Sequence, residues 1–143
     1  MVQKRSNTVK IPYRVAYQDT DAGGVVYYAN YLGFMERGRN EYLRQLGRSI
    51  KDYQDSGIFF VVVEAALRYR APAVLDDLLT IETWIEEGRR SSAVFGQRVL
   101  REGDGTLLVK GDIRVACIND RLRPTRLPPE LLPGRGGEPR LAD

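Results

Sequence analysis

The sequence predicts an α+β fold in which one long helix packs on one face of an antiparallel sheet. Three observations predict it: an alternating apolar segment near the N-terminus, a segment of helical period, and then four further alternating segments. The turns between the last three segments are short, which favours antiparallel neighbours because parallel strands need long crossover connections. A sheet that packs a helix on a single face is an α+β arrangement.

The first strand is expected over residues 9–17, where every second residue is apolar. Pro12 lies inside this segment and has no backbone N–H to donate to a neighbouring strand. We therefore expect this strand at an edge of the sheet or at a bulge. A loop over residues 19–30 separates it from the helix.

The long helix is predicted over residues 30–46, where apolar residues recur three or four positions apart. Gly38 falls on its apolar side, which lets the helix backbone approach the sheet closely. Gly47 follows the last turn and is typical of the residue that ends a helix. Residues 49–57 then have the pattern of a second, short helix.

Four strands are expected after this short helix, over residues 59–70, 79–85, 93–99 and 107–117. We expect one face of the first of them to carry Val61, Val63, Ala65, Leu67 and Tyr69. A helix covers a width of only about 10 Å. A five-stranded sheet is wider, so either the sheet wraps around the helix or another copy of the chain covers the remainder. We expect a homo-oligomer, either a dimer or a tetramer.

The chain of 143 residues is expected to fold as one domain over residues 1–143, with a core over residues 10–132 and a loose tail over residues 133–143. Hydrophobic residues make up 43% of it, a share typical of globular proteins. It has neither an apolar run of about 18 residues nor an apolar signal segment near its beginning. The sequence therefore predicts a cytoplasmic protein with no stable membrane insertion.

Composition excludes several kinds of active site. The chain has no histidine and a single cysteine, Cys117. Zinc sites of the usual Cys/His kind are thereby excluded, as are Ser-His-Asp and Cys-His catalysis. We expect no metal and no cofactor, so acid–base chemistry must come from Asp, Glu, Lys or Tyr side chains. The net charge of +3 is modest and the basic clusters are short, so we expect a solvated surface and no nucleic-acid partner.

The loop over residues 19–30 holds the most informative polar residues. Asp19 and Asp21 precede the pair Gly23-Gly24, and the predicted helix follows. Free N–H groups at the N-terminal end of a helix can hold a developing negative oxygen beside such a carboxylate. The same two aspartates are also typical turn formers that accept hydrogen bonds from local N–H groups. Spacing alone leaves both interpretations open.

The run from Tyr17 to Tyr31, followed by Phe34–Arg37 and Arg39, resembles the hotdog-fold acyl-CoA thioesterases. The chain is most similar to their 4-hydroxybenzoyl-CoA thioesterase-like branch, which includes the Tol-Pal-associated YbgC type. Weaker matches support the same fold and extend the resemblance over residues 10–132: Tyr69–Ala73, Leu75–Asp77, Arg123-Pro124 and Leu127-Pro128.

The resemblance implies a hotdog fold, in which a sheet of about five antiparallel strands wraps around one long helix. It also implies dimers that join their sheets edge to edge, further pairing into tetramers, and active sites at the subunit interface. The family's catalytic carboxylate corresponds to Asp21, and Gly24 to a position of backbone freedom near the oxyanion site. The backbone N–H of Tyr28 corresponds to the donor for the thioester carbonyl. Asn30 corresponds to the entry into the helix and is expected among the substrate-binding residues.

The activity implied by the resemblance is that of an acyl-CoA thioesterase, which hydrolyses the thioester to a free acid and coenzyme A. Asp21 would act as nucleophile or as general base. We expect Arg89, Arg90 and Ser91 to contact the coenzyme A phosphates, and Glu64 to line the acyl pocket. The alternative is a non-catalytic acyl-CoA binding or sensor protein of the same fold. The sequence leaves the acyl preference open.

Overall fold

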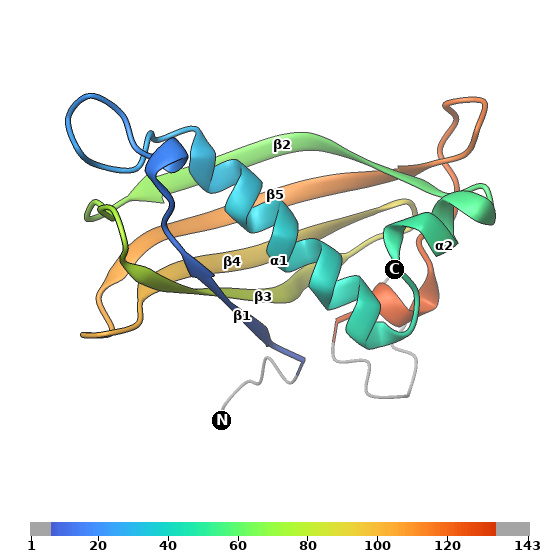
Figure 1. The fold of residues 1–143 in the computed structure, drawn as a ribbon. Helices are drawn as coiled ribbons and strands as arrows, with labels where there is room; N and C mark the ends of the chain where they lie inside the picture. The colour runs from blue at the N-terminus through green and yellow to red at the C-terminus, as the bar shows by residue number, and fades with distance from the viewer. Residues whose placement is uncertain (1–6, 134–143) are drawn as a thin grey trace.

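A five-stranded antiparallel sheet carries one long helix across one of its faces (Figure 1). The computed structural model describes residues 7–133, so that all but residue 133 of the predicted tail lies outside the described residues. The elements, in chain order, are β1 (Val9–Arg14), the 3-10 helix η1 (Tyr17–Asp19), α1 (Asn30–Leu46), α2 (Ile50–Asp55), β2 (Phe59–Tyr69), β3 (Leu78–Gly88), β4 (Ser92–Arg101), β5 (Leu107–Ile118) and the 3-10 helix η2 (Pro129–Leu131). The α+β class predicted from the sequence is confirmed.

The strands lie in the order β1-β3-β4-β5-β2, and every neighbouring pair is antiparallel. Short turns join β3, β4 and β5, whereas β1 and β2, which precede and follow the helices in sequence, take the two edges. Pro12 lies in edge strand β1 opposite Thr80, as its missing N–H predicts. Within residues 7–133, β2 has a neighbouring strand on one side only.

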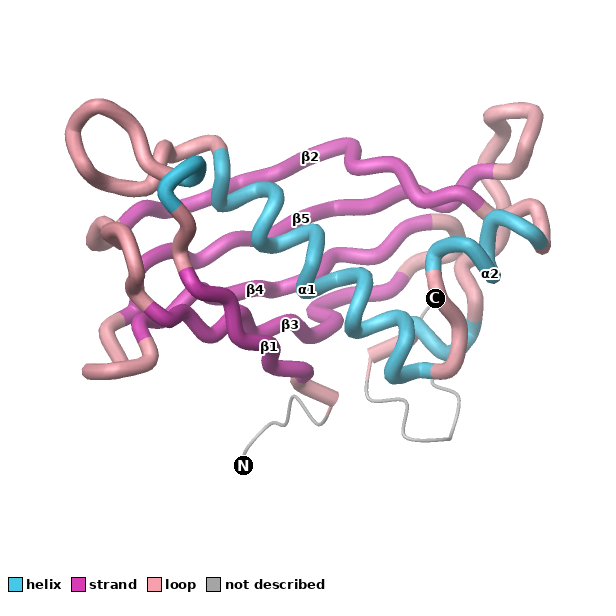
Figure 2. The backbone as a smooth tube through the Cα atoms, viewed as in Figure 1, coloured by secondary structure: helices cyan, strands magenta, loops and turns pink. Residues whose placement is uncertain are grey.

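The long helix crosses the sheet diagonally, as Figure 2 shows. It spans the predicted residues and ends at Gly47, whose φ of 116° is left-handed. At Gly38 the helix backbone comes very close to β3. A Cβ added there would lie 2.5 Å from the Thr83 Oγ1 atom and 2.9 Å from the Ile81 side chain. The close packing predicted at Gly38 is confirmed, because no larger residue fits this crossing.

Apolar residues of α1 and of the facing sides of the strands form the core, whose fully buried members include Met35, Leu79, Ile81, Val99 and Val109. Gln97 is buried among them. Its amide nitrogen donates hydrogen bonds to the Met35 carbonyl oxygen and to Thr83 Oγ1, each across 2.8 Å. Its Oε1 atom accepts one from Arg39 Nη1 across 3.1 Å. The buried amide is therefore satisfied, and it ties α1 to β3 and β4.

The single apolar face predicted for residues 59–70 is wrong, because a bulge interrupts β2. Val62 and Glu64 pair with the adjacent residues Val115 and Arg114, which leaves Val63 without an opposite residue. A bulge of one residue moves the following side chains to the other face of the strand. The valines at 61, 62 and 63 consequently do not form a buried row, and they are 41–56% exposed.

The first strand is shorter than predicted. β1 ends at Arg14, and Tyr17 belongs to η1, where 81% of its surface is exposed. The alternation holds as far as Val15, which is buried and whose amide donates to the Asp77 carbonyl oxygen across 2.9 Å. The chain then leaves the sheet and begins the loop that leads to α1.

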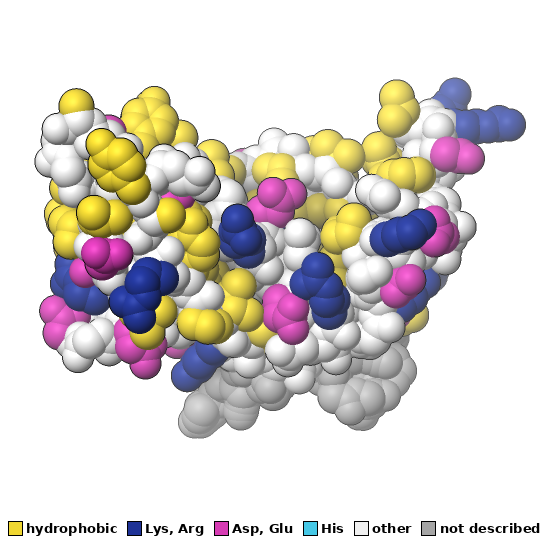
Figure 3. Space-filling model, viewed as in Figure 1, with side chains coloured by type: hydrophobic (Ala, Val, Ile, Leu, Met, Phe, Trp, Pro, Cys, Tyr) yellow, Lys and Arg dark blue, Asp and Glu magenta, His cyan; other side chains and the backbone are white. Residues whose placement is uncertain are grey.

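The helix leaves part of the sheet uncovered near β2. Among the strands, α1 packs mainly against β3 and β1, which lie at the edge of the sheet opposite β2. Hydrophobic side chains reach the surface along the β2 edge, as the space-filling view shows (Figure 3). Exposed valines beside an edge strand with free backbone groups are typical of a surface that pairs with another chain.

Candidate active site

The loop before α1 folds as a tight turn beside the helix end. The Asp21 amide donates to the Val25 carbonyl oxygen, and the Gly24 amide donates to the Asp21 carbonyl oxygen, each across 2.9 Å. The chain reverses at Gly24, where φ is +84°. Residues other than glycine rarely adopt that conformation. The turn therefore needs glycine at this position, and it presents Asp21 at its tip.

Asp19 is buried and holds the loop to its surroundings. Its Oδ2 atom accepts hydrogen bonds from the Tyr13 hydroxyl across 2.7 Å and from the Ala16 amide across 2.8 Å. Its carbonyl oxygen accepts from the Tyr27 amide and from the Asn30 side-chain amide, each across 2.9 Å. Burial, reinforced by the bond to Asp19, raises the pKa of Tyr13. Asp19 is thus a structural residue, and Asn30 fastens the first turn of α1 to the loop.

Asp21 is exposed at the tip of the turn. Its Oδ1 atom accepts a hydrogen bond from the Gly23 amide across 2.8 Å, and its Oδ2 atom accepts none from residues 7–133. Electrostatic interaction with Tyr28 and, most weakly among the causes, with Asp21 raises the pKa of Tyr27. One oxygen of Asp21 is therefore oriented by the turn, while the other is available for chemistry.

The N-terminal end of α1 is not neutralised locally. Its N-cap residue is Ala29, which has no side-chain acceptor, and the first turn contains no acidic residue. The amides of Tyr28 and Ala29 donate to no acceptor within residues 7–133. Free N–H groups and the aligned peptide dipoles make such an end positive. It can therefore stabilise an oxygen that gains negative charge.

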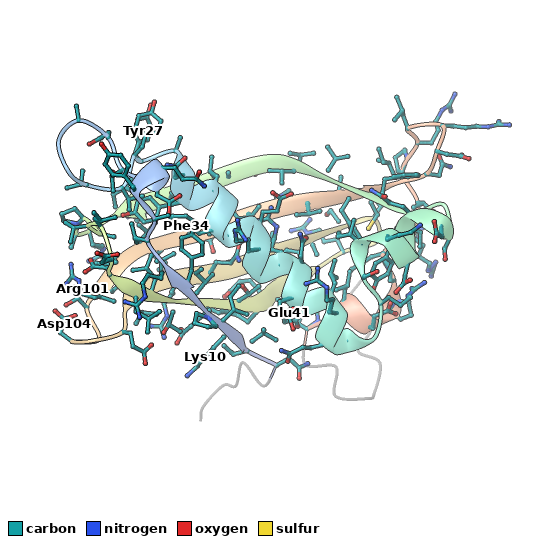
Figure 4. The ribbon with its side chains drawn as sticks, viewed as in Figure 1. Lys10, Tyr27, Phe34, Glu41, Arg101 and Asp104 are labelled. Atoms are coloured by element: carbon teal, nitrogen blue, oxygen red, sulfur yellow. The ribbon has the colours of Figure 1, made fainter. Side chains whose placement is uncertain are left out.

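Three exposed tyrosines surround this helix end, and Tyr27 is labelled among them in Figure 4. The Tyr69 hydroxyl donates to the Tyr28 carbonyl oxygen across 3.0 Å, and the two rings are nearly perpendicular with centroids 6.2 Å apart. Because Tyr69 is the last residue of β2, the edge strand and the loop meet here. Sequence analysis missed Tyr69 as a site residue. The only indication of it in the sequence was the weaker family match over residues 69–73.

The predicted phosphate contacts lie at the opposite end of the sheet. Arg89, Arg90 and Ser91 form the turn after β3, and the 11 residues of β3 extend about 33 Å from the end near the loop. The Leu127 amide donates to the Arg90 carbonyl oxygen across 2.7 Å, which brings residues 121–126 beside the turn. We call this group of exposed arginines the basic end: Arg89, Arg90, Arg121, Arg123 and Arg126.

Glu64 is also distant from the loop. It pairs in register with Arg114, whose neighbours Ile113 and Val115 face the core, so Glu64 lies on the sheet face opposite α1. Its Oε1 atom is 3.5 Å from Arg114 Nε, and 70% of its side chain is exposed. Along β2 it lies about 17 Å from Tyr69. A single chain therefore brings Asp21, Gly24, Tyr28 and Asn30 together, but not Glu64 or the basic end.

Other kinds of site have little support in the described part of the chain. Residues 7–133 contain no group of three or more His, Cys, Asp or Glu residues that could hold a metal ion. Cys117 is fully buried, and burial raises the pKa of its thiol to about 12, which makes it a poor nucleophile. None of the helices within residues 7–133 is long and apolar enough to cross a membrane.

Comparison with known proteins identifies the family. Residues 23–108 match the Thioesterase superfamily. The acyl-CoA thioester hydrolase YbgC of Escherichia coli is 43% identical over 122 residues, which are 85% of this chain and 90% of that protein. The acyl-CoA thioesterase YbgC of Haemophilus influenzae is 41% identical over 127 residues, or 87% of this chain and 92% of that protein.

A solved structure has a similar fold over most of the chain. It is an aspartate-to-asparagine mutant of 4-hydroxybenzoyl CoA thioesterase complexed with 4-hydroxybenzoyl CoA. It superposes with a TM-score of 0.78 at 27% identity and covers 86% of this chain and 94% of its own. The chain therefore belongs to the Thioesterase superfamily, as a thioester-hydrolysing enzyme with the hotdog fold that the sequence predicted.

Proposed function

We propose that the protein hydrolyses acyl-CoA thioesters at the N-terminal end of α1, with Asp21 as the catalytic carboxylate and the Tyr28 amide as the oxyanion donor. The observation that carries this proposal lies in one loop: a carboxylate with a free oxygen stands beside a helix end with free amides. The names of the two YbgC relatives support acyl-CoA as the substrate class. The complex of an aspartate mutant with its CoA thioester supports an aspartate as the reactive group.

Stabilisation of the carbonyl oxygen is the first requirement of the reaction. When the thioester carbon is attacked, its oxygen becomes negative and accepts a hydrogen bond from the Tyr28 amide. One such donor typically contributes about 3 kcal/mol to the transition state.

Asp21 can act by two routes that have the same overall stoichiometry. As a nucleophile, its free oxygen bonds to the acyl carbon, the C–S bond breaks, and water then hydrolyses the mixed anhydride. As a general base, it takes a proton from a water molecule whose oxygen attacks the same carbon, and the proton passes to the leaving sulfur. Either route consumes one water molecule and releases the acid and coenzyme A with Asp21 restored.

The coenzyme A contacts require a second protomer in this proposal. The basic end lies too far from Asp21 to meet the same ligand within one chain. A two-fold axis that pairs the β2 edges in antiparallel fashion reverses the partner and brings its basic end beside this loop. The exposed valines of β2 support such an edge as the dimer contact. Light scattering at micromolar concentration should accordingly show a dimer or tetramer, and a monomer of 16.2 kDa would contradict it.

The activity is tested by incubating the purified protein with acyl-CoAs of increasing chain length and with benzoyl-CoA. Released coenzyme A is measured with a thiol reagent. We expect turnover of at least one acyl class by the wild type and a loss of at least about a hundredfold in Asp21→Asn. Acyl-CoA binding without release of coenzyme A would instead identify a binding protein.

A further inference from the structure

A cavity of about 90 Å³ lies between α1 and the uncovered side of the sheet. Its sheet wall is apolar and includes Val62 of β2 and Phe95 of β4. Its helix wall is polar, with Glu36, Arg39 and Asn40. The volume corresponds to about three water molecules, or to the last few atoms of a chain. An apolar cavity with polar groups on one wall is typical of a small-molecule site that selects by hydrogen bonds.

Arg39 has unused hydrogen-bonding capacity in this cavity. Its guanidinium donates one hydrogen bond to a side chain within residues 7–133, to Gln97 Oε1 across 3.1 Å. A guanidinium has five N–H donors. Within the same residues no carboxylate oxygen lies within 4.0 Å of it to form an ion pair, although Glu36 interacts with it electrostatically. Burial lowers the pKa of Arg39, with Glu36 opposing that effect.

The cavity lies along the helix from the reaction centre. Glu36 is about 12 Å from Tyr28 along the helix axis. Leu32 lies one turn before Glu36 on the same helix face and is 43% exposed. It provides an apolar path between the reaction centre at Tyr28 and the cavity. An extended acyl chain of medium length covers this distance when its thioester carbonyl is held at the Tyr28 amide.

We propose that the cavity receives the far end of a medium-length acyl group and that Arg39 selects groups whose end carries a hydrogen-bond acceptor, such as a hydroxyl. This inference rests on the proposed acyl-CoA hydrolysis. A hydroxyl oxygen accepts from the guanidinium, whereas a terminal methyl displaces water and leaves N–H donors without a partner. Glu36 beside the cavity disfavours a terminal carboxylate, because two negative charges would face each other. Arg39 is thus a specificity-determining residue.

The test compares each acyl-CoA, from octanoyl to dodecanoyl, with its ω-hydroxy counterpart. The ratio of their kcat/KM values is measured on one preparation, so it does not depend on the fraction of active protein. We expect the wild type to favour the hydroxylated chain by about tenfold at the length that reaches the cavity. Arg39→Met should bring the ratio to about one, and Arg39→Lys should keep part of it. Arg44→Met, which changes an exposed arginine of the same helix, should leave the ratio unchanged.

Two results would overturn the inference while leaving the proposed function intact. One is a wild-type ratio of the two kcat/KM values that stays near one at every acyl length. The other is a ratio that Arg39→Met does not alter, which is the result expected if only water occupies the cavity. If Arg39→Met is inactive, Asn40→Trp narrows the same cavity and must also lower the ratio. Failure of the wild type to release coenzyme A from any acyl-CoA would instead refute the proposed function.

Discussion

The Tyr69 hydroxyl donates a hydrogen bond to the Tyr28 carbonyl oxygen across 3.0 Å, so the last residue of β2 contacts the residue whose amide is the proposed oxyanion donor. The bond fixes the peptide plane that follows Tyr28. It also joins the loop that carries the site to a strand of the sheet. An edge strand thereby contributes to the orientation of a loop that lies far from it in sequence.

Tyr69→Phe should lower turnover without unfolding the protein. The substitution removes the hydroxyl and keeps the ring, so the expected loss is that of one hydrogen bond, about 1 kcal/mol or roughly fivefold in kcat. Steady-state kinetics with the preferred acyl-CoA measures it. Tyr17→Phe is the matched control, because Tyr17 is exposed in the same part of the chain and should not affect kcat. Equal kinetics in both variants would show that the Tyr69 contact does not position the donor.

Asp21→Asn should mainly affect turnover, whereas Asp19→Asn should mainly affect stability. Asparagine at 21 can still accept the hydrogen bond from Gly23, but it is neither an anionic nucleophile nor an effective base. Turnover should fall at least about a hundredfold while the thermal midpoint barely changes. Asp19→Asn should mainly lower the free energy of unfolding, because Oδ2 of Asp19 accepts two internal hydrogen bonds. An inactive Asp19→Asn beside an active Asp21→Asn would show that Asp19 is the catalytic carboxylate and that the proposed assignment to Asp21 is wrong.

Sequence periodicity predicted most of the fold because each element has a clear pattern and a clear end. The bounds of α1 follow from its period and from Gly47, and the edge position of β1 follows from Pro12. The bulge at Val63 could not be predicted, since valine is compatible with either face of a strand and the bulge depends on pairing with β5. The apolar run in β2 therefore misled the burial prediction in this edge strand, which α1 leaves largely uncovered.

The candidate site could be predicted only where its residues are close together in sequence. Asp21, Gly24, Tyr28 and Asn30 belong to one loop, so a family motif contains all of them. The Tyr69 contact and the gathering of Arg90 with residues 121–126 depend on tertiary structure, and no spacing rule links these positions. The separation of the basic end from Asp21 likewise emerges only from the direction of β3.

Gly24→Ala and Gly33→Ala should change stability in opposite directions. No atom lies within 4 Å of an added Cβ at either position, so only backbone conformation differs. Gly24 has a left-handed φ of +84°, and alanine there should cost about 1–2 kcal/mol. Gly33 lies inside α1, where alanine should add about 1 kcal/mol. Urea unfolding of both variants measures the sign of each change in the free energy of unfolding. If Gly24→Ala left this free energy unchanged, the turn would have to adjust its backbone to accept alanine.

Cys117 should be unreactive in the folded protein. Its side chain is fully buried, and burial raises the pKa of the thiol to about 12. Thiolate is therefore scarce at pH 8, and the thiol reagent cannot reach it. We expect no reaction with the reagent under native conditions and one reactive thiol per chain in guanidinium chloride. Rapid native labelling would contradict the buried position, and it would also obscure the release of coenzyme A in the same assay.

Mixing two impaired variants should test whether two chains share one site. Asp21→Asn lacks the carboxylate, and the double variant Arg89→Ala/Arg90→Ala lacks part of the basic end. In a two-fold dimer of one chain of each kind, one of the two sites combines an intact Asp21 with the intact arginines of the partner subunit.

Each variant alone should therefore be weak at low acyl-CoA concentration, and an equal mixture that exchanges subunits should recover about a quarter of the wild-type kcat/KM. Activity is measured before and after exchange, which a brief exposure to mild denaturant promotes. If the arginines served the Asp21 of their own chain, one mutation would affect every site of the mixed dimer. The mixture would then show no more than the mean activity of the two variants, and the proposed shared site would be refuted.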